Sequence, residues 1–412
     1  MRESRFRPIL VLLTGNLLGA AVGGIFFLLA SRRFSIDEMG RYTIAISAQF
    51  VTFGLIGTGL SIATLRLTRD RLAAGDRPGA AGTIANALTG ITLMAVVLSI
   101  ASFFVLDLAP TQFALVPGLA VLAILWAGAR GLLDILRSGL LAQQDFSRTA
   151  ILTILSAASG LLALTLVMAS GEFTVRRLLI AHVIGLSGGA LLSVPLLVPL
   201  TREGIRRGSG WPLIDYARWP AASEGTRLLQ GNLGALILAA LAGPAQAGLF
   251  GLGRYPAYVF DVVAVTLYQF WLAKAVHVPE RASMRGYLVR QLQLAGTLGL
   301  AMVVTALLVQ PILPILGENF GRAGSLFVLS AIDFALVLLV RPIESVFHGL
   351  RRPRLELLQR ALTLPVLLLA AVVLVPRFGA MGMAGAHILA SGCSLLFGGL
   401  LLHRTLTIEP AS

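Results

Sequence analysis

Charged side chains occur inside two apolar stretches of the sequence, at spacings that place them on one face of a helix. In residues 119–144, Arg130 and Asp134 are four residues apart and can pair across one helical turn. A second stretch, in the other half of the chain, carries Arg341 and Glu344 three residues apart. A single Arg or Asp at the centre of a membrane-spanning helix costs about 2.5–3.5 kcal/mol on insertion scales. Such charges must face protein or water rather than lipid, so they indicate either a binding site or a structural pair.

Arginine and carboxylate side chains together would give such a site two kinds of chemistry. The planar guanidinium group forms bidentate hydrogen bonds to phosphate. A buried carboxylate beside an arginine can change its protonation when the site is occupied. These residues therefore predict a cavity that attracts anions and contains titratable carboxylates, and the alternative is that they are ion pairs that hold helices together. The charged residues within apolar stretches are Arg130, Arg227, Arg254, Arg341, Asp134, Asp261, Asp333, Glu224 and Glu344.

The composition is that of a membrane protein. Of the 412 residues, 57% are hydrophobic and only 13% are charged, and the mean hydropathy is +0.86. Soluble domains usually have about 25% charged residues, so this chain is too apolar to be one. The net charge of +14 does not indicate nucleic-acid binding, because the arginines form short clusters between apolar runs rather than one basic stripe. Cys393 is the only cysteine, which excludes an intramolecular disulfide.

Twelve apolar runs are long enough to span a bilayer, which takes about 17–25 residues. They begin near residues 9, 42, 83, 113, 149, 178, 220, 249, 287, 323, 355 and 381. The first and seventh runs share Gly-Asn-Leu at residues 15–17 and 231–233, and Arg130 and Arg341 take matching places in the fourth and tenth runs. The sequence therefore predicts an all-α polytopic membrane protein with two six-helix bundles, residues 1–210 and 211–412, related by a parallel internal repeat.

Basic residues are divided unevenly between the loops on the two sides of the membrane. With the N-terminus inside, 22 basic residues, Arg360 among them, fall on the inner side and 7 on the outer side. The positive-inside rule then places both termini in the cytoplasm. The first apolar run follows three arginines and no small-residue cleavage site ends it, so it is interpreted as a membrane helix rather than a signal peptide.

Motifs for catalysis or cofactor binding do not stand in suitable contexts. His182, His348 and His387 occur singly in or near spans, without metal-ligand spacing, and are interpreted as packing or helix-contact residues. Asp37 and Glu38 form an acidic pair in the first outer loop, which would suit a metal-dependent membrane glycosyltransferase. Walker, Rossmann and nucleophile-elbow patterns do not occur where those folds would need them. We therefore expect a transporter without catalytic residues, metal or cofactor, and keep a membrane glycosyltransferase or glycan polymerase as an alternative.

Two longer segments resemble a known family. They are GNLLGAAVGGIFFLLASRRFSIDEMGRYTIAISAQFVTFGLIGTGL, from residue 15, and PILPILGENFGRAG, from residue 311. With the span count and the repeat, they are similar to the polysaccharide flippases of the multidrug/oligosaccharidyl-lipid/polysaccharide exporter superfamily. The resemblance implies an inner-membrane flippase that moves an undecaprenyl-pyrophosphate-linked oligosaccharide to the outer leaflet, for O-antigen or exopolysaccharide assembly. Multidrug exporters of the same superfamily also have twelve spans and are the alternative.

The resemblance also implies a mechanism and partners. Alternating access of the two halves would load the substrate on the inner side and release it on the outer side. Arg130 and Arg341 would bind the pyrophosphate or acidic sugars, and Arg227 and Arg254 would lie nearer the two mouths of the cavity. A proton or sodium ion would couple transport, and the partners would include a polysaccharide polymerase and glycosyltransferases. The candidates for ion coupling or charge pairing are Asp134, Asp261, Asp333, Glu344 and Glu224.

Overall fold

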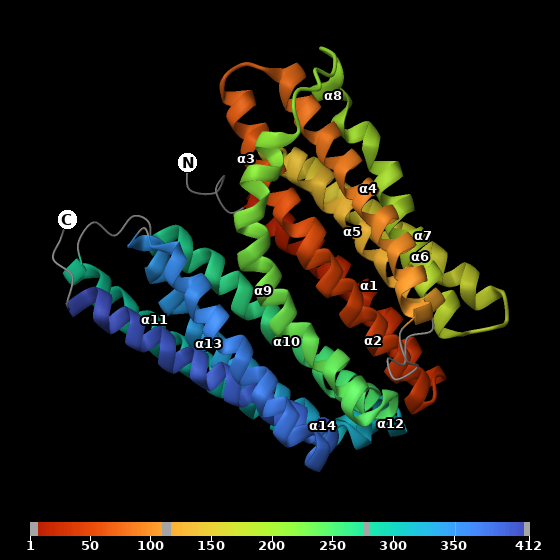
Figure 1. Cartoon of the computed structure of the whole chain (residues 1–412), viewed down its shortest axis with the longest axis vertical. Helices are drawn as coiled ribbons and strands as arrows, with labels where there is room; N and C mark the ends of the chain where they lie inside the picture. Colours follow the sequence, from red (N-terminus) through yellow and green to blue (C-terminus); the bar gives the residue numbers. More distant parts are fainter. Residues whose placement is uncertain (1–6, 109–116, 276–280, 351, 408–412) are drawn as a thin grey trace. The chain divides into compact units, whose positions relative to one another are not determined.

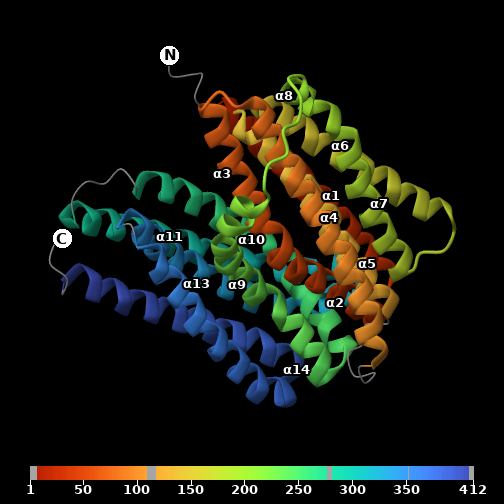
Figure 2. The same ribbon diagram turned by 45° about the horizontal axis from the view of Figure 1, so that its top comes forward.

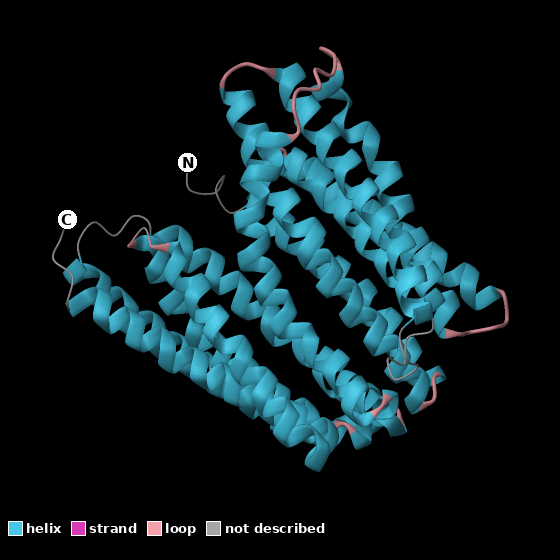
Figure 3. Cartoon of the chain, viewed as in Figure 1, coloured by secondary structure: helices cyan, strands magenta, loops and turns pink. Residues whose placement is uncertain are grey.

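A computed structural model describes residues 7–108, 117–275, 281–350 and 352–407 of the chain. Within these ranges the backbone is helical apart from short turns, and no strand occurs (Figure 3). The tertiary contacts divide the chain into two compact units. The first unit comprises residues 1–34 and 44–233, and the second comprises residues 35–43 and 234–412.

In the first unit, α5 is the central helix. It packs against α3, α4 and α7, while α6 packs against α1 and α7 (Figure 1). Leu60, Ile84, Ile91, Ile135 and Leu140 form a buried apolar core among α3, α4 and α5. The elements in chain order are α1 (Arg7–Arg33), α2 (Ile36–Phe53), the π-helix η2 (Gly54–Thr58), α3 (Gly59–Ala73), α4 (Arg77–Leu108), α5 (Pro117–Ala142), α6 (Phe146–Ala169), α7 (Val175–Ser193), η3 (Val194–Leu197), α8 (Val198–Thr201) and α9 (Trp211–Ala242).

In the second unit, α13 is the central helix. It packs against α10, α11 and α14, which lie beside it in both ribbon views (Figures 1 and 2). Phe250, Leu326, Leu367 and Met383 belong to the apolar core that joins α10, α13 and α14. Among the candidate membrane spans of the described residues, α13 is the most buried, so its charged side chains are enclosed by protein. The elements are α10 (Pro244–Ala275), α11 (Arg281–Val309), η4 (Gln310–Leu316), α12 (Glu318–Arg322), α13 (Gly324–Gly349) and α14 (Pro353–Thr407).

The helices account for the twelve expected spans. Eight helical segments of the described residues are long and apolar enough to cross a membrane. The segment within α14 consists of two helices that meet at Gly379, where φ is 54° and ψ is −129°. With α1, α9 and α10, each 27 residues or longer, the long helices in the described ranges number twelve, and the expected all-α membrane fold is confirmed. The expected start of the fourth span, near residue 113, lies outside the described residues.

The boundary between the two units falls within α9, because residue 233 belongs to the first unit and residue 234 to the second. The start of α2 likewise belongs to the second unit, since residues 35–43 have their contacts there. Contacts therefore group the chain differently from a division by span order. The division into six-helix bundles at residue 210 is not tested by these contacts and stays a prediction.

Candidate functional site

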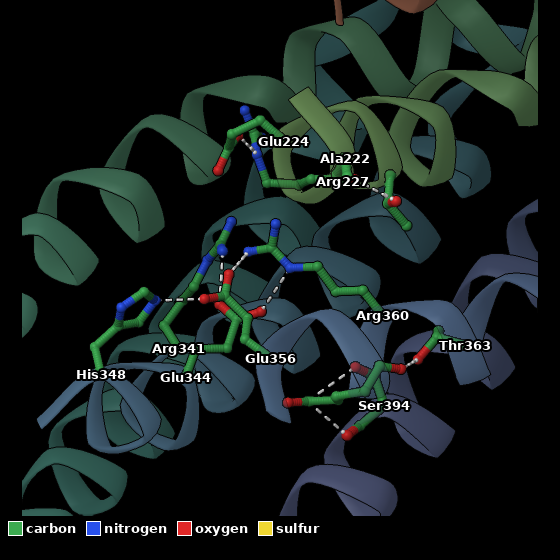
Figure 4. Close-up of polar contacts among 12 residues, drawn as sticks. Ala222, Glu224, Arg227, Arg341, Glu344, His348, Glu356, Arg360, Thr363 and Ser394 are labelled. Atoms are coloured by element: carbon green, nitrogen blue, oxygen red, sulfur yellow. Dashed lines mark hydrogen bonds and ion pairs between the residues drawn. The ribbon is translucent and has the colours of Figure 1, made fainter. Parts of the chain in front are cut away.

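Five ionisable side chains form a continuous chain of contacts between α13 and α14, which we call the α13–α14 ion network (Figure 4). Arg341 Nη1 donates a hydrogen bond to Glu344 Oε2 at 2.8 Å, and Arg360 Nε donates one to Glu344 Oε1 at 3.2 Å. Arg360 also forms an ion pair with Glu356, whose other carboxylate oxygen lies 2.5 Å from His348 Nε2. Cations and carboxylates therefore alternate along the network from Arg341 to the histidine.

Helical spacing positions this network. Arg341, Glu344 and His348 are three and four residues apart and share one face of α13, while Glu356 and Arg360 are four residues apart near the start of α14. The chain turns back between the two helices, so the two faces meet. The arginines and glutamates are buried, whereas the His348 side chain is 31% exposed. Two arginines balance two glutamates, so the network occupies an apolar setting without an unpaired charge.

The guanidinium group of Arg341 is enclosed on a second side by α10. Its Cζ atom lies 5.1 Å from the centroid of the Tyr268 ring, a cation–π geometry. The carboxylate of Glu344 and this ring together cover the group. An anion that binds Arg341 through Nη1 would therefore have to displace Glu344, whereas the buried Nε has no hydrogen-bond partner among the described residues.

A second buried group joins α10, α13 and α14 in the same unit. Arg254 Nη1 donates a hydrogen bond to Asp333 Oδ2 at 2.9 Å, and Ser391 Oγ donates one to Asp333 Oδ1 at 2.6 Å. His387 Nδ1 lies 4.0 Å from the same carboxylate. The Arg254 Cζ atom lies 5.0 Å from the centroid of the Phe334 ring. Both oxygens of the Asp333 carboxylate are thus occupied, and the charge of Arg254 is paired.

Asp261 differs from the other predicted carboxylates of the second unit. It lies on α10 and is half-buried. Among the described residues, no basic nitrogen forms an ion pair with its carboxylate within 4.0 Å, although its charge interacts with that of Arg341 at longer range. Asp261 is therefore a carboxylate that can take up a cation without first losing a salt bridge.

In the first unit, Arg130 and Asp134 form the expected pair, but loosely. Arg130 Nε lies 3.9 Å from Asp134 Oδ2, which is within ion-pair range and beyond hydrogen-bond range. The Arg130 side chain is 41% exposed. Its Cζ atom lies 5.3 Å from the ring centroids of both Phe50 and Phe53 on α2. The aromatic rings hold the guanidinium group in place while its N–H groups stay available for an anion.

The π-helix η2 directly follows these phenylalanines and lies close to two charged segments. A Cβ atom at Gly131 of α5 would lie 3.9 Å from the η2 backbone, and one at Gly225 of α9 would lie 3.4 Å from an η2 carbonyl oxygen. These glycines adjoin Arg130 on α5 and Glu224 on α9. Short π-helical turns are frequent at functional sites, and this one brings the charged parts of α5 and α9 against one element.

The charged pair on α9 has the geometry of a helical salt bridge. Arg227 Nε donates a hydrogen bond to Glu224 Oε2 at 2.6 Å, and both side chains are half-buried (Figure 4). Because the two residues are three positions apart, the sequence already predicted this pair. Its role in binding or in structure stays a prediction.

Three members of the α13–α14 ion network, Arg360, Glu356 and His348, were not among the candidate site residues. Arg360 was expected in an inner loop, and this expectation is wrong, because α14 begins at Pro353 and buries the side chain. Glu356 was not considered. Glu356 and Arg360 are four residues apart, the same spacing that predicted the pair Arg130 and Asp134, so the sequence could have indicated them.

The three histidines interpreted as packing or helix-contact residues have different surroundings. His182 is stacked between Phe26 and Trp126, with ring centroids 4.1 and 4.0 Å away, which is a packing role. His348 and His387 instead lie against carboxylates, as described above. Both histidines therefore contact a neighbouring helix, and the sequence could not name their carboxylate partners because these lie on other helices.

The acidic pair that was expected in an outer loop lies at the start of a helix. Asp37 and Glu38 lie in the first turn of α2, and Glu38 Oε2 accepts hydrogen bonds from the backbone N–H and the hydroxyl of Ser35, both at 3.0 Å. This is the reciprocal arrangement of a capping box. Across the described part of the chain, no group of three or more His, Cys, Asp or Glu side chains could hold a metal ion.

Comparison with known proteins identifies the fold. No protein-family model matches the sequence, and no curated protein matches it. A solved structure of the lipid II flippase MurJ in an inward closed conformation is 14% identical and has a TM-score of 0.75, with 96% of this chain and 87% of that chain covered. The chain has the fold of such transporters.

Two further solved structures give the same result. An inward-facing multidrug resistance MATE family transporter of the MOP superfamily is 14% identical, with a TM-score of 0.70 and coverage of 94% of this chain and 99% of that chain. A MOP superfamily transporter from Pyrococcus furiosus, described as having a binding pocket of reverse polarity, is 14% identical, with a TM-score of 0.64 and coverage of 98% and 95%. The fold thus spans nearly the whole chain and is common to flippases and multidrug transporters.

Proposed function

We propose that the chain is a flippase that moves an undecaprenyl-pyrophosphate-linked oligosaccharide from the inner to the outer leaflet of a bacterial inner membrane. The observation that carries this proposal is Arg130. Its guanidinium group lies in a membrane helix, is 41% exposed, and has no carboxylate within hydrogen-bond range among the described residues. A planar cation kept available at such a cost suits a phosphate ligand. The fold shared with a lipid II flippase supports the same class of substrate.

The remaining predicted arginines have carboxylate partners, which links phosphate binding to ion coupling. Phosphate binding at Arg254 or Arg341 replaces Asp333 or Glu344 as the hydrogen-bond acceptor. A carboxylate displaced in this way is neutralised by a proton or paired with a sodium ion, because an unpaired charge in an apolar setting is unfavourable. Occupancy of the arginines and uptake of a coupling ion therefore accompany each other. Arg227, Asp134 and Glu224 take corresponding roles in the first unit.

The transport cycle that we propose is alternating access of two six-helix bundles, residues 1–210 and 211–412, with both termini in the cytoplasm. No bond of the substrate is made or broken, so no catalytic residue or cofactor takes part. Glycosyltransferases of O-antigen or exopolysaccharide assembly supply the lipid-linked glycan, and the polymerase consumes it. Parallel repeats of this kind place the substrate near the bilayer midplane.

The test measures surface glycan in a flippase-deleted strain that expresses variants of this chain, with membrane abundance measured alongside. Arg130→Gln should abolish export, and Arg130→Lys should retain part of it, because an ammonium group keeps the attraction and loses the bidentate geometry. The double variant Arg130→Gln/Asp134→Asn leaves no unpaired charge and should remain abundant but inactive. Near-normal glycan from the double variant would show that Arg130 only balances Asp134.

A multidrug antiporter is the second candidate, because MATE family transporters share the fold over at least 94% of this chain. The discriminating experiment is dye efflux from proteoliposomes with an imposed ion gradient. The guanidinium group of Arg130 attracts anions and repels cations, so a lipophilic cation should not be exported. Gradient-dependent efflux of a cationic dye would replace the flippase proposal by the antiporter.

A further inference from the structure

One end of the first unit carries an excess of arginine. This end, which we call the basic end, consists of the turn between α3 and α4 with the adjoining helix ends and of residues 202–210, which connect α8 to α9 (Figure 1). We call residues 202–210 the strap. The arginines of the basic end are Arg66, Arg69, Arg71, Arg77, Arg202, Arg206 and Arg207, and its acidic residues are Asp70, Asp76 and Glu203.

The strap is held against the first turns of α4. The backbone N–H of Arg206 donates to the carbonyl oxygen of Pro78 at 2.9 Å, and the Arg206 guanidinium group pairs with Asp76 at 2.6 Å. The Asn86 amide donates to the carbonyl oxygen of Gly208 at 3.1 Å. Backbone and side-chain contacts therefore hold the strap against α4 at residues 206 and 208.

Three arginines of the basic end have no acidic partner. Each of the three acidic residues is in an ion pair, with Arg66, Arg77 or Arg206. Arg69, Arg202 and Arg207 are exposed, and none of them forms an ion pair with a described residue. Seven cations against three anions leave the basic end with a charge of four, counting Arg71, whose guanidinium group donates to a backbone carbonyl.

Large apolar side chains are exposed beside these arginines. Ile205 in the strap is 54% exposed, and Trp211 and Ile214 in the first turn of α9 are 68% and 56% exposed. Tryptophan is enriched where membrane helices meet the headgroup layer. Apolar side chains inserted at that depth, beside cations that face anionic lipid, are the two components of interfacial binding.

We propose that the basic end binds the headgroups of acidic phospholipids, with Trp211 and Ile205 inserted at the boundary of the acyl chains. Charge complementarity selects an acidic over a zwitterionic headgroup, because the three arginines have no internal anion to satisfy them. The exposed apolar side chains favour a lipid surface over a nucleic acid or a soluble acidic protein, which would leave them in water. The surface is separate from the charged residues of the spans, so binding does not depend on transport.

The expected selectivity follows from the charge of the three arginines. A cation near an anionic membrane surface gains about 1 kcal/mol, which corresponds to roughly five-fold in affinity. Removing three should therefore lower the affinity for an acidic lipid by about 100-fold at low ionic strength, and added salt should reduce the difference. The affinity for a zwitterionic lipid should not change.

The experiment compares the triple variant Arg69→Gln/Arg202→Gln/Arg207→Gln with the unaltered protein. Native mass spectrometry of the detergent-solubilised protein, titrated with phosphatidylglycerol or phosphatidylcholine, counts the bound lipids and gives their affinities. The matched control exchanges three exposed arginines at the other end of the helices of this unit, Arg32→Gln/Arg33→Gln/Arg176→Gln. The control has the same net charge as the test variant, so it separates position from total charge.

We expect the affinity for phosphatidylglycerol to fall in the triple test variant but not in the control. Trp211→Ala should lower the affinity for both lipids. Soluble glycerophosphate should not compete, because it cannot use the apolar side chains. An equal fall in the control, or equal binding of the two lipids by the unaltered protein, would overturn the proposal. The substituted arginines are exposed, so monodispersity and helix content should be unchanged. If the triple variant loses monodispersity or helix content, the same lipid titration of Trp211→Ala decides the outcome. Unchanged affinity of Trp211→Ala for phosphatidylglycerol would then overturn the proposal.

Discussion

Replacing Arg360 by methionine should destabilise the protein by about 3–5 kcal/mol, the usual cost of removing one partner from a buried ion pair. Arg360 is the cation shared by two buried carboxylates, Glu344 at 3.2 Å and Glu356. Methionine retains much of the apolar stem, so the change mainly removes charge. Glu344 keeps Arg341 and Glu356 keeps His348, which places the expected value inside that range rather than above it.

Two further variants define the physical cause. Arg66 pairs with Asp70 at 3.2 Å on the exposed surface, and Arg66→Met should cost no more than about 1 kcal/mol because water solvates the remaining charge. Replacing the two arginines and two glutamates of the ion network together, by Arg341→Met, Glu344→Gln, Glu356→Gln and Arg360→Met, leaves none of these four charges without a partner. This fourfold variant should therefore be more stable than Arg360→Met alone.

The free energy of unfolding is measured by titration with sodium dodecyl sulfate in mixed micelles, followed by circular dichroism at 222 nm as a general probe of helix content. The assay does not require a substrate, so it is independent of the proposed function. A cost for Arg360→Met as small as that for Arg66→Met would refute the reasoning. So would a fourfold variant that is less stable than Arg360→Met, because the penalty would then come from packing rather than from unpaired charge.

Two further predictions concern pH and packing. A hydrogen bond from the backbone N–H three residues later, and the ion pair with Arg206, hold the pKa of Asp76 below its ordinary 3.8. The Asp76 contribution to strap binding is therefore complete above pH 3.8 and is lost as the pH falls through the lowered pKa. A nitroxide label on the strap should become mobile only in that acidic range in the unaltered protein, whereas in Asp76→Asn the label should be mobile at neutral pH. Equal mobility of the label in the two proteins at neutral pH would contradict this prediction. A Cβ atom at Gly40 would overlap the carbonyl group of Pro244, so Gly40→Ala should cost about 1–3 kcal/mol in the same detergent titration. Gly24→Ala, which meets no atom within 4 Å, is its control and should not be destabilising, since alanine favours helix.

The sequence by itself determined the class of the protein and the pairs within single helices. Its apolar composition leaves too few charges for a soluble domain, and the length of each apolar run follows from bilayer thickness. Ion pairs within a helix follow from a period of 3.6 residues, so Arg341 with Glu344 and Glu224 with Arg227 could be expected. The pair of Arg130 with Asp134 could be expected too. Its long distance of 3.9 Å could not, because the Arg130 guanidinium group lies against an aromatic ring of another helix.

Only the tertiary structure decided which helices share their charges. Arg254 pairs with Asp333, 79 residues later, and Arg360 crosses from α14 to Glu344 on α13. Helical periodicity gives the face on which a side chain lies, but not the rotation of that helix against its neighbours or the helix that it meets. Those are set by the packing of whole apolar faces, a sum of many weak contacts spread over both helices. For this reason Arg254 could be recognised from the sequence as a charge within a span, while its partner on another helix could not.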